Sequence, residues 1–140
     1  IKGDIKEAEK LLHSSMEKHK KNYGLKYPTT ISYIQNYGVF LRNINKLEDA
    51  LITLKQSDKA HKNFYGENSL ERAYPLSALG QTEFILKNYK KAKRYYNKAL
   101  KIRESNLKND DVAVITIRER LIELKKVDKK KRSSLSKTVS

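Results

Sequence analysis

The most regular feature of the chain is a pattern of small and large apolar residues that recurs every 42 positions. Ala8, Ala50 and Ala92 follow this step, and the residues around them keep it too. The large positions are Ile5, Leu47 and Tyr89, then Leu12, Leu54 and Tyr96, and the glycines are Gly38 and Gly80. Self-similarity at a fixed period of this length is typical of repeat architectures.

Within each repeat the apolar residues are spaced by three and four, which predicts amphipathic α-helices. The chain contains two kinds of such segment, and they alternate along the sequence. The predicted helices cover residues 4–22, 29–43, 46–64, 72–87, 89–105 and 112–126.

The residues between these segments favour helix ends. Gly24 and Gly66 each follow a predicted helix, at the place where a left-handed residue closes the last turn most easily. Pro28 precedes the second helix, where its missing N–H costs little. Pro75 is compatible with the fourth helix only if that helix begins near Arg72, so that the ring lies in the first turn.

The small residues predict how the helices pack. Ala92 and Ala99 allow the face of the preceding helix that carries Gly80 to approach closely. Tyrosines on either side, among them Tyr96, fill the space that the small residues leave. Because each helix pair buries one face on its partner and another on the next pair, the pattern predicts an all-α solenoid of antiparallel helix pairs.

This organisation predicts one repeat domain and a tail. Residues 1–126 form the domain, with a partial first repeat, two full repeats and a C-terminal capping helix, and residues 127–140 form a basic, disordered tail. The chain starts at Ile1 rather than at Met and near a helix of the second kind, which suggests a fragment or a processed form. Its apolar residues in 5–12 then lack a partner, and we expect an upstream helix or another chain to cover them.

Composition narrows the chemistry. The chain has no cysteine, and its three histidines lack metal-ligand spacing, so neither a metal site nor a cofactor is expected. No nucleophile–base motif or phosphate loop is present, so we expect no catalytic residue, no small-molecule substrate and no enzymatic activity. The net charge of +15 favours an acidic partner, and residues 125–140 alone contribute seven cations against Asp128.

The small–large pattern resembles the tetratricopeptide repeat (TPR) superfamily. The matching residues are Gly38, Ala50, Leu54 and Ser57, then Gly80, Ala92, Tyr96 and Ala99. The 42-residue period and the stretch YGLKYPTTISYIQNYG at 23–38 are similar to the kinesin-light-chain subgroup. The resemblance implies a right-handed superhelix. Glu83 departs from it, since that position usually holds an aromatic residue.

The C-terminal third shows a narrower likeness. Its segment LKNDDVAVITIRERLIELKK at 107–126 is similar to the end of the mitochondrial TPR proteins of complex III assembly. This likeness implies an intracellular, mitochondrial location and a role as a respiratory-complex assembly factor. A cytoplasmic location is the alternative.

The TPR resemblance also implies a binding groove, lined by the first helix of each pair and suited to a protein or peptide partner. Its predicted lining residues are Gln35, Asn36, Arg42, Asn43, Tyr74, Gln81 and Arg120, within a wider row that includes Ser32, Val39, Ser77, Ala78, Ile85, Thr116, Glu119 and Glu123. Arginine binds carboxylates bidentately, so Arg42 and Arg120 predict a partner with acidic groups.

The main alternative is a basic helical module that binds nucleic acid or an anionic membrane surface. Nucleic-acid binding is disfavoured because the tyrosines fall mostly at core positions, which leaves few of them free to stack on bases.

Overall fold

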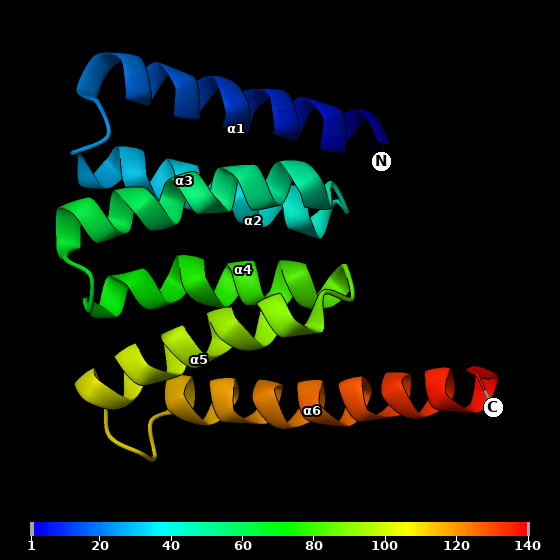
Figure 1. Ribbon diagram of the computed structural model, residues 1–140. Coiled ribbons are helices and arrows are strands. Elements are labelled where there is room, and N and C mark those ends of the chain that lie inside the picture. Colours follow the sequence, from blue (N-terminus) through cyan, green and yellow to red (C-terminus); the bar gives the residue numbers. More distant parts are fainter. Residues whose placement is uncertain (1, 140) are drawn as a thin grey trace.

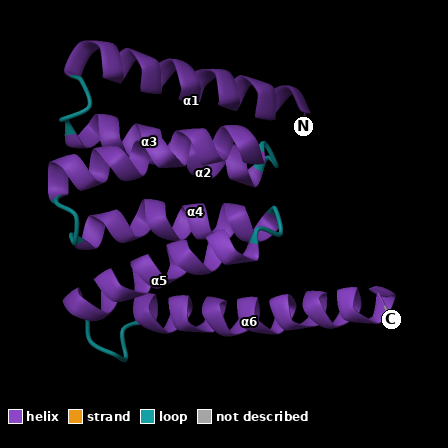
Figure 2. Cartoon of the chain, in the orientation of Figure 1, coloured by secondary structure: helices purple, strands orange, loops and turns teal. Residues whose placement is uncertain are grey.

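The computed structural model describes residues 2–139, with side chains to Lys137, and its elements are helices joined by short loops (Figure 2). Ile1 and Ser140, which the predicted domain and tail include, lie outside the described residues. The elements are α1 (Lys2–Tyr23), α2 (Pro28–Asn43), α3 (Leu47–Tyr65), the short 3-10 helix η1 (Leu70–Arg72), α4 (Ala73–Ile85), α5 (Tyr89–Asn106) and α6 (Val112–Val139).

The helices stack one after another, and each runs back along its predecessor (Figure 1). α1 lies at one end of the stack and α6 at the other, and the far half of α6 projects beyond its neighbours (Figure 1). The predicted all-α fold of antiparallel helix pairs is confirmed for the described residues.

The same turn closes both complete helix pairs. Asn45 and Lys87, which are 42 residues apart, have φ angles of 65° and 64° after α2 and α4. The next amide in each turn reaches back to the helix: Lys46 N–H donates to Leu41 at 2.8 Å, and Asn88 N–H donates to Glu83 at 2.9 Å. This is the Schellman arrangement, which satisfies carbonyl groups that a helix end would otherwise leave unpaired.

The prediction for Pro75 is confirmed. The 3-10 helix η1 ends at Arg72 and α4 begins at Ala73, so Pro75 lies in the first turn, where no intrahelical N–H is lost. Arg72 holds the junction, since its Nε donates to Asp58 Oδ1 on α3 at 2.8 Å. Asp111 caps the last helix, because Ala113 N–H donates to Asp111 Oδ1 at 2.9 Å.

Close helix approach occurs at the two glycines in the first helices. A Cβ atom on Gly38 would lie 2.7 Å from Leu54 Cδ2, and one on Gly80 would lie 2.6 Å from the ring of Tyr96. Both distances are shorter than real carbon contacts, so glycine is required for α2 to reach α3 and for α4 to reach α5. The small residues of α3 and α5, Ala50, Ser57, Ala92 and Ala99, are fully buried.

The predicted disordered tail is replaced by helix. α6 does not end at residue 126 but runs to Val139. No glycine or proline follows Val112, and lysine, arginine and leucine are good helix formers. Two contacts support the extension: Arg132 Nη2 lies 3.3 Å from Asp128 Oδ2 one turn earlier, and Lys131 Nζ lies 5.3 Å from the centre of the Tyr89 ring.

The outward side of α1 lacks a partner within the described chain. Ile5 is 42% exposed, whereas its equivalent Leu47 on α3 is 8% exposed. Ala8 and Leu12 are only half-buried, whereas their equivalents on α3 and α5 are fully buried. The expectation that the apolar residues in 5–12 lack a partner is met only in part, because Ile5 is exposed whereas Leu12 packs against the core cluster that contains Ile34 and Leu41 of α2. What covers the remaining surface stays a prediction.

Candidate functional site

A small cavity opens where the three first helices α2, α4 and α6 come together over α5. Its volume is about 220 Å³. The lining residues are Arg42 from α2, Gln81, Phe84 and Ile85 from α4, Tyr96 from α5, and Arg120 and Glu123 from α6. Residues from all three first helices therefore meet at this cavity, although they are far apart in sequence.

Arg42 is held in place by amides. Its Nη1 donates to Gln81 Oε1 at 2.5 Å, while Nε and Nη2 donate to Asn43 Oδ1 at 3.4 and 3.2 Å. Burial lowers the pKa of Arg42, and the nearby charge of Arg120 lowers it further. Among the described residues no carboxylate forms an ion pair with Arg42, so the site contains a half-buried cation whose partners are neutral.

Arg120 reaches the same cavity from the last helix. Its Nη1 donates to Ser77 Oγ on α4 at 3.0 Å. Arg120 likewise forms no ion pair with a described carboxylate. Two arginines from different repeats thus share this cavity with Glu123, whose carboxylate also lines it but forms an ion pair with neither arginine. Each arginine lowers the cost of bringing a further acidic group there.

Tyr96 of α5 lines the same cavity as the two arginines. Burial raises the pKa of Tyr96 to about 12, with a smaller rise from the Glu123 carboxylate, while Arg120 and Arg42 act in the opposite direction. The phenol therefore stays protonated at neutral pH, and its O–H is a donor. The sequence analysis placed Tyr96 in the core and left it out of the groove, as it did Phe84. Periodicity could not reveal that one edge of a core ring also borders a surface cavity.

Ile85 and Glu123 from the wider predicted row also line this cavity, whereas the remaining predicted lining residues of the groove lie outside it. Gln35 is engaged in helix packing, since Ser57 Oγ on α3 donates to Gln35 Oε1 at 2.7 Å. Asn36 is exposed, and Tyr74 is 64% exposed on α4. Asn43 contributes indirectly, through Arg42. The structure therefore brings Arg42, Gln81 and Arg120 together, while their role in binding stays a prediction.

Two other kinds of site are missing from the described part of the chain. No cluster of three or more histidine, cysteine or carboxylate side chains there is arranged to hold a metal ion. No helix within residues 2–139 combines the length and apolar character needed to cross a membrane.

Sequence and structure comparisons bear on the fold. Residues 73–106, which form α4 and α5, match the tetratricopeptide repeat. No curated protein matches the chain.

Three similar solved structures have low sequence identity to this chain. The first is a protein of Podosopora anserina described as a kinesin light chain with nearly identical TPR-like repeats, with 12% identity, a TM-score of 0.81, and coverage of 96% of this chain and 64% of that one. A point variant of the same protein has 13% identity and a TM-score of 0.79, with coverage of 88% of this chain and 58% of that one. BtubC (BKLC) from P. vanneervenii has 13% identity and a TM-score of 0.71, with coverage of 96% of this chain and 59% of that one.

At these identities the likeness concerns the fold alone. The chain spans about three fifths of the length of the structures it matches. The predicted likeness to TPR repeats of the kinesin-light-chain kind agrees with these structures, whereas none of the comparisons shows the likeness to complex III assembly proteins. The protein has the fold of a TPR-like α-solenoid, and the segment that forms α4 and α5 matches a tetratricopeptide repeat.

Proposed function

We propose that the protein is a non-catalytic interaction scaffold that binds an acidic side chain of a partner peptide in the cavity between Arg42 and Arg120. The single observation that carries the proposal is the meeting of these two arginines, from α2 and α6, with no carboxylate paired to either in the described chain. TPR repeats generally mediate protein–protein interaction, which supports a role of this class.

The size of the cavity limits what it can hold. A volume of about 220 Å³ accommodates one side chain and not a drug-sized ligand. An aspartate or glutamate there could accept hydrogen bonds from both guanidinium groups, and the Tyr96 hydroxyl offers a third donor. The flanking peptide would pass over the first helices, where Asn36 and Tyr74 are exposed.

A phage-displayed library of random linear peptides tests the proposal. Selection on the wild-type chain should enrich peptides with a fixed aspartate or glutamate. The double variant Arg42→Ala/Arg120→Ala should bind those peptides at least about 100-fold more weakly, since each lost charge-assisted bond is worth about 1.5–3 kcal/mol. Arg94→Ala, which removes an exposed arginine of α5 outside the cavity, is the matched control.

Enrichment without acidic residues would contradict the proposal, as would equal losses in the control. The alternative of a basic module on nucleic acid or membrane makes a different prediction. Binding to duplex DNA or anionic vesicles would fall steeply with salt and would depend on total charge, not on the two cavity arginines.

We also propose a finer role as a mitochondrial assembly factor, which rests on the sequence likeness of residues 107–126. The test is the location of the tagged full-length protein in its own cells, followed by purification of its complexes from isolated mitochondria. A cytoplasmic location would rule this role out and leave the scaffold function in place.

A further inference from the structure

Positive charge is concentrated where the start of α5 meets the second half of α6. Residues 87–94 contain five basic side chains and no acidic one. Residues 125–132 contain six basic side chains and one acidic one, Asp128, which pairs with Arg132. The two segments together hold a net charge of +10, which is two thirds of the +15 of the whole chain.

Between these segments lies a groove with an apolar floor. Its volume is about 540 Å³, and it is lined by both helices. Tyr89 from α5 and Leu121, Ile122 and Leu124 from α6 supply the apolar surface. Ile122 is 56% exposed although it is a large aliphatic side chain.

The rims of the groove are cationic on both sides. Lys90 and Lys93 stand on α5, and Lys125 stands on α6. All three are exposed, and no carboxylate of the described chain forms an ion pair with them. The groove therefore combines an apolar floor with unpaired lysines along each edge, which is the complement of an acidic amphipathic segment.

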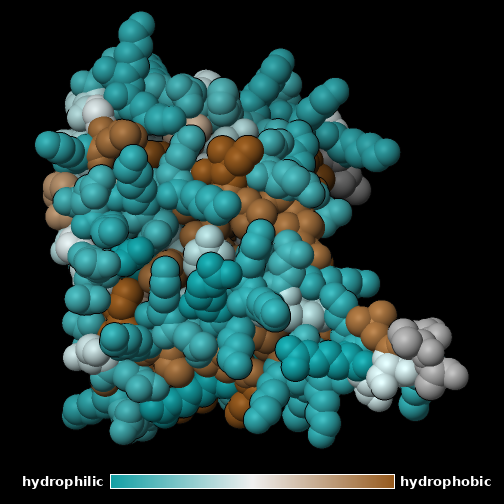
Figure 3. Space-filling view, viewed as in Figure 1, coloured by the Kyte–Doolittle hydropathy of each residue, from teal (hydrophilic) through white to brown (hydrophobic). Residues whose placement is uncertain are grey.

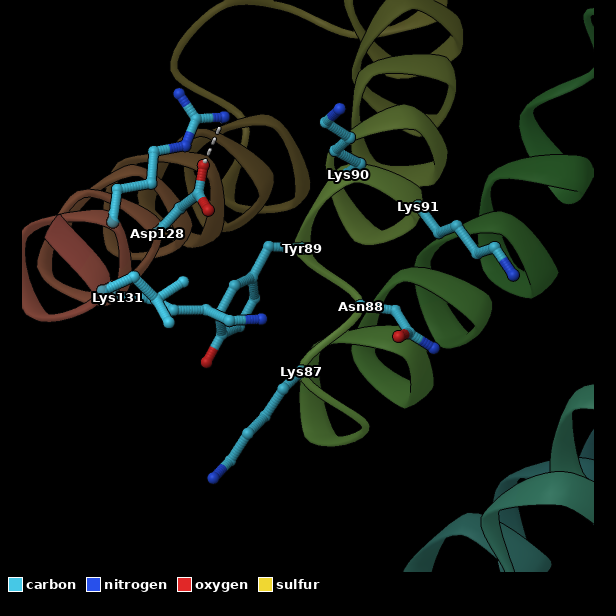
Figure 4. Close-up of a pocket in the computed structure, with 9 residues that line it drawn as sticks. Lys87, Asn88, Tyr89, Lys90, Lys91, Asp128 and Lys131 are labelled. Carbon is cyan, nitrogen blue, oxygen red and sulfur yellow. Dashed lines mark ion pairs between the residues drawn. The ribbon is translucent and has the colours of Figure 1, made fainter. Parts of the chain in front are cut away.

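The adjoining pocket at the start of α5 is less suitable for an anion. Figure 4 shows Tyr89 projecting toward α6, with Lys131 beside its ring, while Lys91 points away from α6. Asp128 pairs with Arg132, and both side chains line the groove as well as this pocket (Figure 4). Of the cations that line this pocket, Lys91 points away from α6, Arg132 is paired, and Lys90 also belongs to the groove. The lysine-rimmed groove is therefore the stronger candidate.

We propose that the groove between α5 and α6 binds an acidic amphipathic helix of a partner protein, whose aliphatic side chains contact Ile122 and Tyr89 and whose carboxylates pair with Lys90, Lys93 and Lys125. Two features favour this partner over other polyanions. A nucleic-acid backbone makes no use of an apolar floor. A bilayer surface is flat on this scale and does not reach a floor that lies between two helices.

The register of the repeat agrees with a helical occupant. Ile122 stands 42 residues after Gly80, at the position where α2 and α4 receive the helix that follows them. Within residues 2–139 no helix packs on this position of α6. An isoleucine in place of glycine keeps an incoming helix farther away, which leaves room for the lysine side chains to reach its carboxylates.

The probe is a synthetic peptide with leucine at positions i, i+3, i+4 and i+7 of a helix and glutamate at most others. Fluorescence anisotropy of the labelled peptide should show binding to the full chain, and Lys93→Glu/Lys125→Glu should weaken it about tenfold or more. Ile122→Asp should weaken it to a similar degree. The control Lys59→Glu/Lys62→Glu changes net charge equally on exposed lysines of α3 and should leave the affinity within about twofold.

Two further peptides distinguish the contribution of the apolar floor to binding from that of the lysine rims. A peptide with glutamine in place of every glutamate, and one with serine in place of every leucine, should each bind about tenfold more weakly. Equal binding of either peptide, or equal losses in the α3 control, would overturn the proposal. Duplex DNA or phosphatidylserine vesicles that compete with the peptide and lose affinity with the same groove variants would reassign the surface to a polyanion.

The concave cavity provides an internal reference. Arg42→Ala/Arg120→Ala lies outside the α5–α6 groove and should leave binding of the amphipathic peptide unchanged. A loss with that variant would overturn the groove assignment, whereas failure of the library selection above would leave it standing.

Discussion

The two ends of the solenoid differ in chemistry, although both are terminal helices. The outward face of α1 keeps the residues that the interior helices use for packing: Ile5, Ala8 and Leu12 match Leu47, Ala50 and Leu54 of α3 in position and size. On α3 these residues are buried, while on α1 they are partly open to solvent.

The outward face of α6 has lost that pattern. The buried residues Leu76, Gly80 and Glu83 of α4 correspond to Arg118, Ile122 and Lys125 of α6. Two of the three positions have become cations, and the glycine that admits a neighbouring helix is gone. The surface view shows hydrophilic side chains over most of one face, with apolar patches between them (Figure 3).

The difference indicates which end of the stack is adapted to water. A terminal repeat with a polar outer face protects a solenoid from solvent and from further stacking. The outer face of α6 is only partly of this kind, since its cations stand beside the exposed side chains of Ile115 and Ile122. The face of α1 keeps the packing residues instead, so we expect an upstream helix or another chain to cover it, whereas α6 offers a rimmed groove to a different kind of partner.

The largest expected effect contrasts glycine inside the stack with isoleucine at its end. Gly80→Val should destabilise the fold by about 3 kcal/mol or more, because its Cβ would overlap the ring of Tyr96, which is only 2% exposed. Ile122→Val, at the same register on α6, should change stability by less than about 0.5 kcal/mol. Urea unfolding followed by circular dichroism measures both, and comparable losses would mean that α6 is packed as tightly as α4.

The second prediction compares the same leucine position in two repeats. Leu54→Ala should cost about 2–5 kcal/mol, since the side chain is fully buried between α2 and α3. Leu12→Ala should cost clearly less in the isolated chain, because Leu12 is only half-buried. Similar values for the two variants, with a concentration-dependent melting temperature, would show that a second copy already covers α1.

The third prediction concerns Glu83, which replaces the leucine found at the same register in α2, Leu41. Glu83 is 2% exposed, and its Oε2 has no hydrogen-bond partner among the described residues. Glu83→Leu should therefore stabilise the fold by about 1–3 kcal/mol by removing an unsatisfied buried polar group. Urea denaturation with Glu83→Gln as the isosteric control gives the answer, and a destabilised leucine variant would reveal a partner for this carboxylate.

The smallest expected effect concerns the helical extension of α6. Asp128→Ala removes the pair with Arg132 and should lower the stability of the last turns by about 0.3–0.5 kcal/mol. Amide hydrogen exchange of residues 127–137 is the sensitive measurement, and residues of α3 serve as the reference. Unchanged exchange would indicate that helix propensity and the contact of Lys131 with Tyr89 are sufficient.

Much of the fold follows from the sequence because small and large residues recur at the same positions of each repeat. The 42-residue spacing of Ala50 and Ala92, together with Gly38 and Gly80, predicts which helices meet and how closely. The position of Pro75 in a first turn followed from the effect of a proline ring inside a helix. The prediction of disorder was wrong for residues 127–139. Low apolar content suggested disorder, but a lysine-rich sequence without glycine or proline also favours helix.

The candidate site could be predicted only in part. Arg42 and Arg120 stand out as cations on the first helices, and Gln81 follows from the same face. Gln35 does not join them because Ser57 engages it in packing between α2 and α3. Tyr96 was missed because a residue buried at 2% exposure can still line a cavity with the edge of its ring.

The sequence by itself determined the helices, their order and the close contacts between them, since those depend on local spacing and on side-chain size. Only the tertiary structure decided which charges face one another: that Arg42 and Arg120 share a cavity, and that the lysines of α5 and α6 flank one apolar floor. The physical reason is that helix packing is specified by short-range steric fit within a repeat, whereas the meeting of residues 78 positions apart depends on how successive pairs stack.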